Sequence, residues 1–272
     1  MADDASALSG VDTGLDTSVS HSARIWNYWL GGKDNYEADR IAGDRVAEML
    51  PIIVTQARAD RAFLGRAIRY LAGEAGLRQF LDIGTGIPAA GNTHEVAQRV
   101  APDTHVVYVD NDPIVLLHAE ALLRSTPEGA TDYVQADLRD PSTILDRGAA
   151  LLDFGQPVAV MLLGVLHLIQ DAEDPWGIVA RLMAAMPPGS YLTISHPAID
   201  IHQSQANAQR IYNERVATPQ TLRTREQVAR FFTGLELVDP GLVQVHQWRP
   251  DPGDLIPEGT VSAHGAVARK PA

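Results

Sequence analysis

The sequence predicts an α/β protein with a doubly wound, mostly parallel sheet whose last strand is antiparallel. From Leu77 onward, short runs of Val, Ile and Leu alternate with segments of helical period. Continuous apolar strands separated by helices are typical of a parallel sheet that is covered on both faces. The last two apolar runs, 235–239 and 261–270, are separated by a stretch rich in Pro and Gly that has no helical period. A return without a crossover helix predicts an antiparallel final strand.

These patterns predict each element in order. Seven strands are expected, at 79–83, 105–109, 131–135, 157–163, 190–195, 235–239 and 261–270. Helices are expected between the parallel strands, at about 92–100, 113–124, 141–152 and 174–186, and another follows the fifth strand at about 202–216. Thr224 and Gln227 form a capping box that predicts the start of one more helix.

The chain divides into three parts by composition. Residues 1–19 are small, polar and acidic, and predict a disordered tail. Residues 20–75 are predicted to form a helical cap, with breaks at Gly31–Gly32 and at Pro51. Residues 76–272 form the predicted α/β domain, with a helical insertion at about 200–222.

Charge and composition exclude several classes of function. The formal net charge is −12, whereas a nucleic-acid or membrane partner requires clustered Lys and Arg, so neither partner is expected. Four arginines, Arg58, Arg61, Arg66 and Arg69, are expected on the solvent face of a helix rather than in a basic patch. The chain has no cysteine, and no spacing of His or carboxylates suggests a metal.

Targeting signals are not predicted. The amino-terminal segment is acidic and lacks the basic and apolar regions of a signal peptide. The longest apolar run, 158–169, is too short to span a bilayer. A soluble, cytoplasmic protein is therefore expected.

A glycine turn follows the first predicted strand, where ligands of doubly wound sheets bind. Gly84 and Gly86 would let a ligand approach the backbone, and Asp82 lies at the end of the strand. The bare pattern also matches a dinucleotide fingerprint. However, the next helix is predicted to start only at Asn92, set back from where a pyrophosphate would bind. The Asp82 carboxylate would also repel a pyrophosphate, whereas it would attract a sulfonium or an ammonium.

Two more acids follow the next two strands. Asp110 ends the second strand, where a carboxylate can accept hydrogen bonds from both hydroxyls of a ribose. Asp137 follows the third strand and can accept from an adenine amine, with the backbone of Leu138 beside it. The alternative is that both acids merely begin turns, as Asp often does. Three acids after three consecutive strands favour an adenosine site with a cationic group.

At these motifs the sequence resembles the class I S-adenosylmethionine-dependent methyltransferases. The resembling motifs are "LDIGTGIP", "YVDND", "QADLRD" and "VMLLGVLHLIQD". Outside them, "ARIWNYWLGGKDNYEADR", "QARADRAFLGRAIRYLA" and "LELVDPGLVQVHQWRPD" resemble an actinobacterial family of uncharacterised S-adenosylmethionine methyltransferases, once catalogued as a domain of unknown function. The usual third glycine of the turn is missing, and Ile87–Pro88 stands there instead.

The resemblance implies a Rossmann-like fold, S-adenosylmethionine as cofactor and a set of cofactor-binding residues. Asp82, Gly84 and Gly86 would lie near the methionine end of the cofactor. Asp110, with its neighbour Asn111, would bind the ribose, and Asp137 with Leu138 the adenine. Gly164 and Val165 would form the wall beside the methionine part. Asp60 stands where the family more often has Asn, and no role is assigned to it.

The segment "WLGGKDNY" is a candidate lid or cofactor clamp. Trp29 and Tyr36 could cover the site, and Lys33 or Arg58 could pair with the methionine carboxylate. The alternative is that Gly31–Gly32 simply end a helix and the aromatic rings pack on the sheet edge.

Two histidines follow predicted strands and are candidate proton acceptors. His167 follows the fourth strand and His196 the fifth. A histidine at a strand end is also often a structural, hydrogen-bonded group. The helical cap and the insertion are expected to flank the mouth of the pocket, and the insertion could also be an oligomer surface.

Three functions remain open at this stage. The first is methyl transfer from S-adenosylmethionine to an oxygen or nitrogen of a small molecule. The second is a non-catalytic S-adenosylmethionine-binding protein, and the third a nicotinamide-dependent oxidoreductase. The sequence identifies neither the methyl acceptor nor the oligomeric state.

Overall fold

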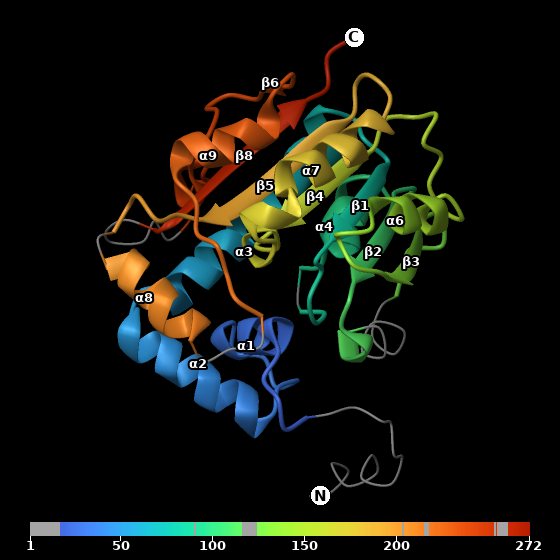
Figure 1. Cartoon of the computed structure of the whole chain (residues 1–272). Coiled ribbons are helices and arrows are strands. Elements are labelled where there is room, and N and C mark those ends of the chain that lie inside the picture. The colour runs from blue at the N-terminus through green and yellow to red at the C-terminus, as the bar shows by residue number, and fades with distance from the viewer. Residues whose placement is uncertain are drawn as a thin grey trace, which may run out of the picture.

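The protein was examined as a computed structural model, which describes residues 17–89, 91–115, 124–202, 204–214, 218–252, 254 and 261–272. Its centre is a twisted sheet with strand order β3-β2-β1-β4-β5-β8-β6, and β7 also pairs with β8 (Figure 1). The strands are β1 (Gln79–Ile83), β2 (His105–Asp110), β3 (Ala130–Gln135), β4 (Ala159–Leu163), β5 (Tyr191–Pro197), β6 (Glu236–Leu237), β7 (Val243–Gln244) and β8 (Ala263–Arg269).

The first five strands are parallel, and β8 is antiparallel to its neighbours β5, β6 and β7. The doubly wound sheet with an antiparallel last strand is therefore confirmed. Within the residues that the structure describes, the sheet has eight strands rather than the expected seven, because the two-residue strand β7 also pairs with β8. A strand of two residues is too short to produce a recognisable apolar pattern.

Helices cover both faces of the sheet and its carboxyl edge. The α-helices in the described residues are α1 (Ser22–Trp29), α2 (Glu37–Met49), α3 (Ile53–Arg69), α4 (Thr93–Val100), α6 (Pro141–Gly148), α7 (Pro175–Ala184), α8 (Ser204–Asn213) and α9 (Arg225–Ala229). Of the predicted helix at 113–124, residues 113–115 are helical, residue 124 is not, and 116–123 lie outside the described part. Residues 1–16 of the predicted tail also lie outside it.

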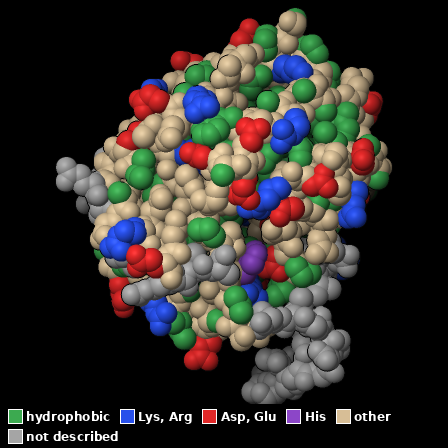
Figure 2. Space-filling model, viewed as in Figure 1, with side chains coloured by type: hydrophobic (Ala, Val, Ile, Leu, Met, Phe, Trp, Pro, Cys, Tyr) green, Lys and Arg blue, Asp and Glu red, His purple; other side chains and the backbone are tan. Residues whose placement is uncertain are grey.

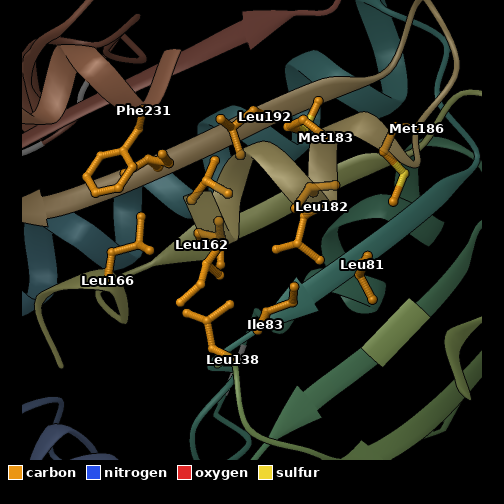
Figure 3. Packing of buried hydrophobic residues seen from close by; sticks show 14 of the residues in the cluster. Leu81, Ile83, Leu138, Leu162, Leu166, Leu182, Met183, Met186, Leu192 and Phe231 are labelled. Atoms are coloured by element: carbon orange, nitrogen blue, oxygen red, sulfur yellow. The ribbon is translucent and has the colours of Figure 1, made fainter. Parts of the chain in front are cut away.

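Two apolar clusters form the core, one on each face of the sheet. Leu81 and Ile83 of β1 pack with residues of α6 and α7 on one face, where Leu182 and Met183 contribute (Figure 3). Phe80 of β1 belongs to the other cluster, with residues of α3 and α4. All five residues of β1 are buried, as expected for a central parallel strand.

Helix α3 carries the four arginines that were predicted on a solvent-exposed helix face, and this prediction is wrong for Arg61 and Arg66. Arg66 is buried and donates to the carbonyl oxygens of Val245 (2.7 Å) and Trp248 (2.8 Å). Arg61 faces the sheet edge and donates to the carbonyl oxygen of Ala89 at 3.1 Å. Both arginines satisfy carbonyl groups of distant loops, which the helical period alone cannot reveal.

Helices α1, α2 and α8 form a separate layer beyond the carboxyl ends of the parallel strands (Figure 1). The buried side chains of Arg24 and Asp39 form an ion pair at 3.2 Å that joins α1 to α2. Asp39 also accepts a hydrogen bond from the backbone N–H of His21 at 2.9 Å. This layer, called the helical layer below, closes one side of a cavity. None of the helices in the described part of the chain is long and apolar enough to cross a membrane.

Candidate functional site

A cavity of about 210 Å³ lies between the carboxyl ends of the strands and the helical layer. Its wall includes the ends of β1, β2, β4 and β5 and the segments that follow the first four strands. Residues of α1, α2, α3 and α8 complete it. The amino-terminal helices and the segment 200–222 were expected to flank the pocket, and residues of both contribute to its wall.

The glycine turn after β1 has a backbone that only glycine adopts without strain. Gly84 has φ +77°, and its N–H donates to the carbonyl oxygen of Val109 at 2.8 Å. A Cβ at Gly84 would lie 2.5 Å from Val165, closer than carbon atoms can approach. The turn thus depends on glycine both for its conformation and for its contact with the loop after β4.

Asp110 lies at the end of β2 and lines the cavity. Its Oδ2 accepts a hydrogen bond from the N–H of Gly86 at 2.8 Å, and its Oδ1 accepts one from the N–H of Asp112 at 3.0 Å. Burial raises the pKa of the Asp110 carboxyl, and these two N–H groups partly offset the effect. Each oxygen keeps a lone pair, so the carboxylate can still accept from two hydroxyls of a ligand. Asn111 is exposed and lines the cavity beside it.

Asp82, at the penultimate position of β1, is almost completely buried at the cavity wall. Its Oδ2 accepts from the hydroxyl of Thr93, the first residue of α4, at 2.5 Å. Burial raises the pKa of Asp82 to about 6, although the Thr93 hydrogen bond and the Arg61 charge act against it. Helix α4 begins directly after Asn92, so the helix start is set back from the glycines as predicted.

Asp137 and Leu138 follow β3 and line the cavity. Leu138 is buried and belongs to the core cluster, so it offers an apolar surface. Asp137 accepts from the N–H of Arg139 at 2.8 Å and pairs with the Arg139 guanidinium at 3.2 Å. Arg139 also pairs with Glu173 at 2.6 Å. A ligand that bonds to Asp137 therefore shares it with Arg139.

Gly164 and Val165 follow β4 and line the cavity. Asp60 of α3, to which the sequence assigned no role, lines it as well. A Cβ at Gly164 would come 3.7 Å from Oδ2 of Asp60 on α3. Burial raises the pKa of the Asp60 carboxyl to about 6, while the nearby Ser195 hydroxyl and Arg61 lower it in part. Helical period would have found Asp60, because Ile53, Gln56 and Asp60 lie on one face of α3, and all three line the cavity.

His167 lies in a short 3₁₀ turn after β4 and lines the cavity. Its Nδ1 is buried and has no hydrogen-bond partner. Burial, followed by the charge of Arg223, lowers the pKa of His167 to about 4. The ring is therefore neutral at pH 7 and can accept a hydrogen bond or a proton.

His196 is outside the cavity wall, which corrects its prediction as a proton acceptor. It is completely buried, and its Nδ1 lies 2.8 Å from the carbonyl oxygen of Pro197. Because that oxygen only accepts, Nδ1 donates, and Nε2 accepts from Arg223 at 2.9 Å. Burial holds the pKa of His196 well below its ordinary value. Both ring nitrogens are therefore committed to the structure.

Three residues predicted to clamp the cofactor are also outside the cavity wall: Lys33, Tyr36 and Arg58. Arg58 is exposed on the side of α3 away from the cavity-facing residues Gln56 and Asp60. Tyr36 caps α2, and its ring packs 5.4 Å from the Arg24 guanidinium. Lys33 is exposed in the turn between α1 and α2. Trp29 of the same segment does line the cavity.

The chemistry of the wall suits a nucleoside with a cationic group. Four carboxyl groups line it, those of Asp60, Asp82, Asp110 and Asp137. Carboxylates favour a positive charge in a partly desolvated cavity. Within the described ranges, no group of three or more His, Cys, Asp or Glu side chains could hold a metal ion.

Comparison with known proteins agrees with this geometry. Residues 9–271 match a protein family described as S-adenosyl methyltransferase. A DUF574 family protein of Streptomyces avermitilis MA-4680 is 49% identical, with a TM-score of 0.90 over 94% of this chain and 99% of that one. A protein of Thermobifida fusca YX, named as a candidate methyltransferase, is 41% identical, with a TM-score of 0.87 over 96% of this chain and 98% of that one.

More distant similarity extends to the fold alone. An S-adenosylmethionine-dependent methyltransferase of Anabaena variabilis ATCC 29413 is 13% identical, with a TM-score of 0.51 over 93% of this chain and 98% of that one. No curated protein matched the chain. The resemblance to a methyltransferase is confirmed, and the oxidoreductase alternative is excluded. The chain belongs to the S-adenosyl methyltransferase family, whose members are enzymes that use S-adenosylmethionine.

Proposed function

We propose that the enzyme transfers the methyl group of S-adenosylmethionine to an oxygen or nitrogen of a small molecule. One observation carries this proposal. A single cavity is lined both by the glycine turn with Asp110 and by the unpartnered imidazole of His167. A cofactor and a second, smaller molecule would therefore share one enclosed space.

The residues of the wall fit the cofactor in three respects. Gly84 and Gly86 have no side chain that would occupy the space beside the backbone. The two oxygens of Asp110 retain lone pairs for the two ribose hydroxyls. The carboxyl groups of Asp60 and Asp82 favour the sulfonium and the ammonium of the methionine part.

The adenine would lie against the segment after β3. Leu138 is buried in the core and would contact one face of the ring. Asp137 would accept from the exocyclic amine while it keeps its pair with Arg139. Gly164 and Val165 would border the methionine part, as the resemblance implies.

When bound, S-adenosylmethionine supplies the methyl group. The protein's part is to align the acceptor, exclude water and receive the acceptor's proton. His167 suits the last task, since its ring is neutral above a pKa of about 4 and its Nδ1 is unpartnered. An oxygen or nitrogen that is being methylated becomes a much stronger acid, so even a weak base can take its proton.

Charge supports a small acceptor rather than a nucleic acid. The net charge is −12, and basic side chains are interspersed with acidic ones on the face shown in Figure 2. Neutralising a phosphate backbone requires a cluster of Lys and Arg. A cytoplasmic location is part of the same proposal.

The first test is calorimetric titration with S-adenosylmethionine and S-adenosylhomocysteine, with NADH as the control ligand. Micromolar binding of both sulfur ligands and no response to NADH is the expected result. Tight binding of NADH alone would contradict the proposal.

The second test measures S-adenosylhomocysteine formation with a panel of phenols and amines. With any accepted compound, His167→Gln should lower kcat more than tenfold while the Kd for S-adenosylhomocysteine stays within twofold. Unchanged kcat in this variant would remove His167 from the proposed chemistry. A parallel assay offers nucleic acid and protein as acceptors, and turnover confined to these would show that the small-molecule assignment is wrong.

A further inference from the structure

We propose that the methyl acceptor is a flat, largely apolar molecule without negative charge, which carries a hydroxyl or an amine. We infer that it binds between the helical layer and the His167 turn. This inference rests on the proposed function and assigns the class of substrate. It is carried by three features of the cavity wall: its apolar helices, its unpartnered polar atoms and its charge.

The wall formed by the helical layer is largely apolar and aromatic, although Ser22, Asn27 and Gln205 also contribute to it. Trp26 and Trp29 of α1 both line the cavity, with ring centroids 5.9 Å apart and planes inclined at 66° to each other. The apolar side chains around them in the same wall are Leu30, Val46, Met49, Leu50 and Ile53. This wall lies across the cavity from the strand ends, where the cofactor would bind. Rings and apolar side chains of this kind bind flat apolar ligands.

Three buried polar atoms without a hydrogen-bond partner belong to residues that line the cavity. They are Oε1 of Gln56 on α3, Nδ1 of His167 after β4 and Nε2 of Gln205 on α8. The side chains of Gln56 and Gln205 are each only 3% exposed, so solvent does not satisfy them. A buried polar atom without a partner is unfavourable, and such atoms in native proteins are nearly always bonded.

Because all three side chains line the cavity, we infer that they turn these atoms toward the ligand when it binds and so define its polar part. The Gln56 oxygen only accepts, and the Gln205 nitrogen only donates. A hydroxyl or an amine can both donate and accept, so it matches this mixture. A hydrocarbon would leave all three atoms unsatisfied, and a carboxylate could not donate to Gln56.

The charges of the wall disfavour an anion. Arg61 and Arg139 are the arginines among the described lining residues, and both have partners. Arg61 donates to Ala89 and Asn92 at 3.1 Å each, and Arg139 pairs with Asp137 and Glu173. His21 pairs with Asp112 at 3.0 Å. A carboxylate or phosphate acceptor would instead face Asp60 and Asp82, whereas a neutral molecule or a cation would not be repelled.

The test uses three ligands that differ in one substituent: 2-naphthol, 2-naphthylamine and 2-naphthoate. Each is titrated by calorimetry into the full-length protein saturated with S-adenosylhomocysteine at pH 7.5. The naphthol and the naphthylamine should bind at least tenfold more tightly than the naphthoate.

Gln56→Leu and Gln205→Leu should each weaken naphthol binding at least fivefold without changing the Kd for S-adenosylhomocysteine. Gln156→Leu, an exposed glutamine outside the cavity wall, is the matched control and should change neither affinity.

Equal or tighter binding of the naphthoate would overturn the inference about charge. If S-adenosylhomocysteine binds but none of the three ring compounds does, the inference about a flat apolar acceptor is wrong, while the proposed function stands. If S-adenosylhomocysteine itself fails to bind, the proposed function fails first. Normal naphthol affinity in both glutamine variants would refute the role of the unpartnered amides.

Discussion

The carboxylate of Asp110 accepts a hydrogen bond from the N–H of Gly86 at 2.8 Å. The acid that ends β2 therefore also holds the glycine turn that follows β1. This contact joins two parts of the proposed cofactor site that are 24 residues apart in the chain. Removal of the side chain would disturb the turn as well as remove a ligand contact, so a single alanine variant cannot separate the two effects.

Asp110→Ala and Asp110→Asn should separate these effects. The asparagine keeps an acceptor oxygen for the turn but loses the charge. Because hydrogen bonds to a charged group contribute about 1.5–3 kcal/mol, we expect Asn to weaken S-adenosylhomocysteine binding roughly tenfold or more, and Ala to weaken it further. Calorimetry measures both. Asp132→Asn, an exposed carboxylate on β3, is the control. Wild-type affinity in Asp110→Ala would contradict the ribose assignment.

Gly84→Ala and Gly91→Ala form a matched pair, because both glycines have φ +77°. A Cβ at Gly91 meets no atom within 4 Å, whereas one at Gly84 would collide with Val165 at 2.5 Å. We expect Gly91→Ala to cost about 1–2 kcal/mol of unfolding free energy from its left-handed backbone alone. Gly84→Ala should cost about 1–3 kcal/mol more from the collision, and it should also weaken cofactor binding. Urea denaturation measures the difference, and equal costs would show that the Val165 contact relaxes without penalty.

Asp60 should make stability depend on pH in a defined direction. Its pKa is raised from 3.8 to about 6 by burial, so the folded protein keeps a proton that the unfolded chain releases. Between about pH 4 and pH 6 the folded state therefore binds more protons, and the free energy of unfolding falls as pH rises. The difference between the two pKa values corresponds to about 3 kcal/mol.

Asp60→Asn removes this contribution and keeps the shape of the side chain. The stability of the variant relative to wild type, measured by urea denaturation without cofactor from pH 4.5 to 7.5, should therefore increase with pH up to about 6 and then level off. Asp82 titrates in the same range but is present in both proteins, so it cancels in the comparison. A stability difference that stays constant with pH would mean that Asp60 titrates normally.

Arg223 should contribute strongly to the free energy of unfolding. Its side chain is fully buried and donates to the carbonyl oxygens of Leu166 and Ile169 at 2.9 and 2.8 Å, and to His196. Arg223→Met would leave these three buried acceptors unpaired, each at about 1–3 kcal/mol, so we expect a total loss of at least about 3 kcal/mol. The measurement is urea denaturation. Arg181→Met, which removes an exposed pair with Asp174, should cost under about 1 kcal/mol. Similar losses in the two variants would contradict this account.

Local sequence patterns predicted the sheet and the central residues of the proposed cofactor site. The apolar runs of β1 and β2 and the glycines after β1 are local features, and a parallel sheet brings consecutive strand ends to one edge. Asp82, Gly84 and Asp110 therefore reach the cavity wall as expected. The short strand β7 was not predicted, because two residues form no periodic pattern.

Which helical and loop side chains face the cavity was decided by tertiary packing. Helical period places Arg58 and Asp60 on opposite sides of α3, but packing decides which side faces the cavity, and it turns Asp60 toward Gly164. Two further side chains that helices contribute, Gln56 and Gln205, come from α3 and α8 and belong to no local motif.

By itself the sequence determined the family, the sheet and the acids at its edge, because each depends on spacing within a few residues. It could not distinguish His167 from His196, since each comes after the predicted end of a parallel strand, although His196 proves to lie within β5. Only the folded chain brings Arg223 against His196 and leaves Nδ1 of His167 unpartnered. The reason is physical: the protonation and accessibility of a buried group depend on partners distant in the chain, and those partners are assembled only by folding.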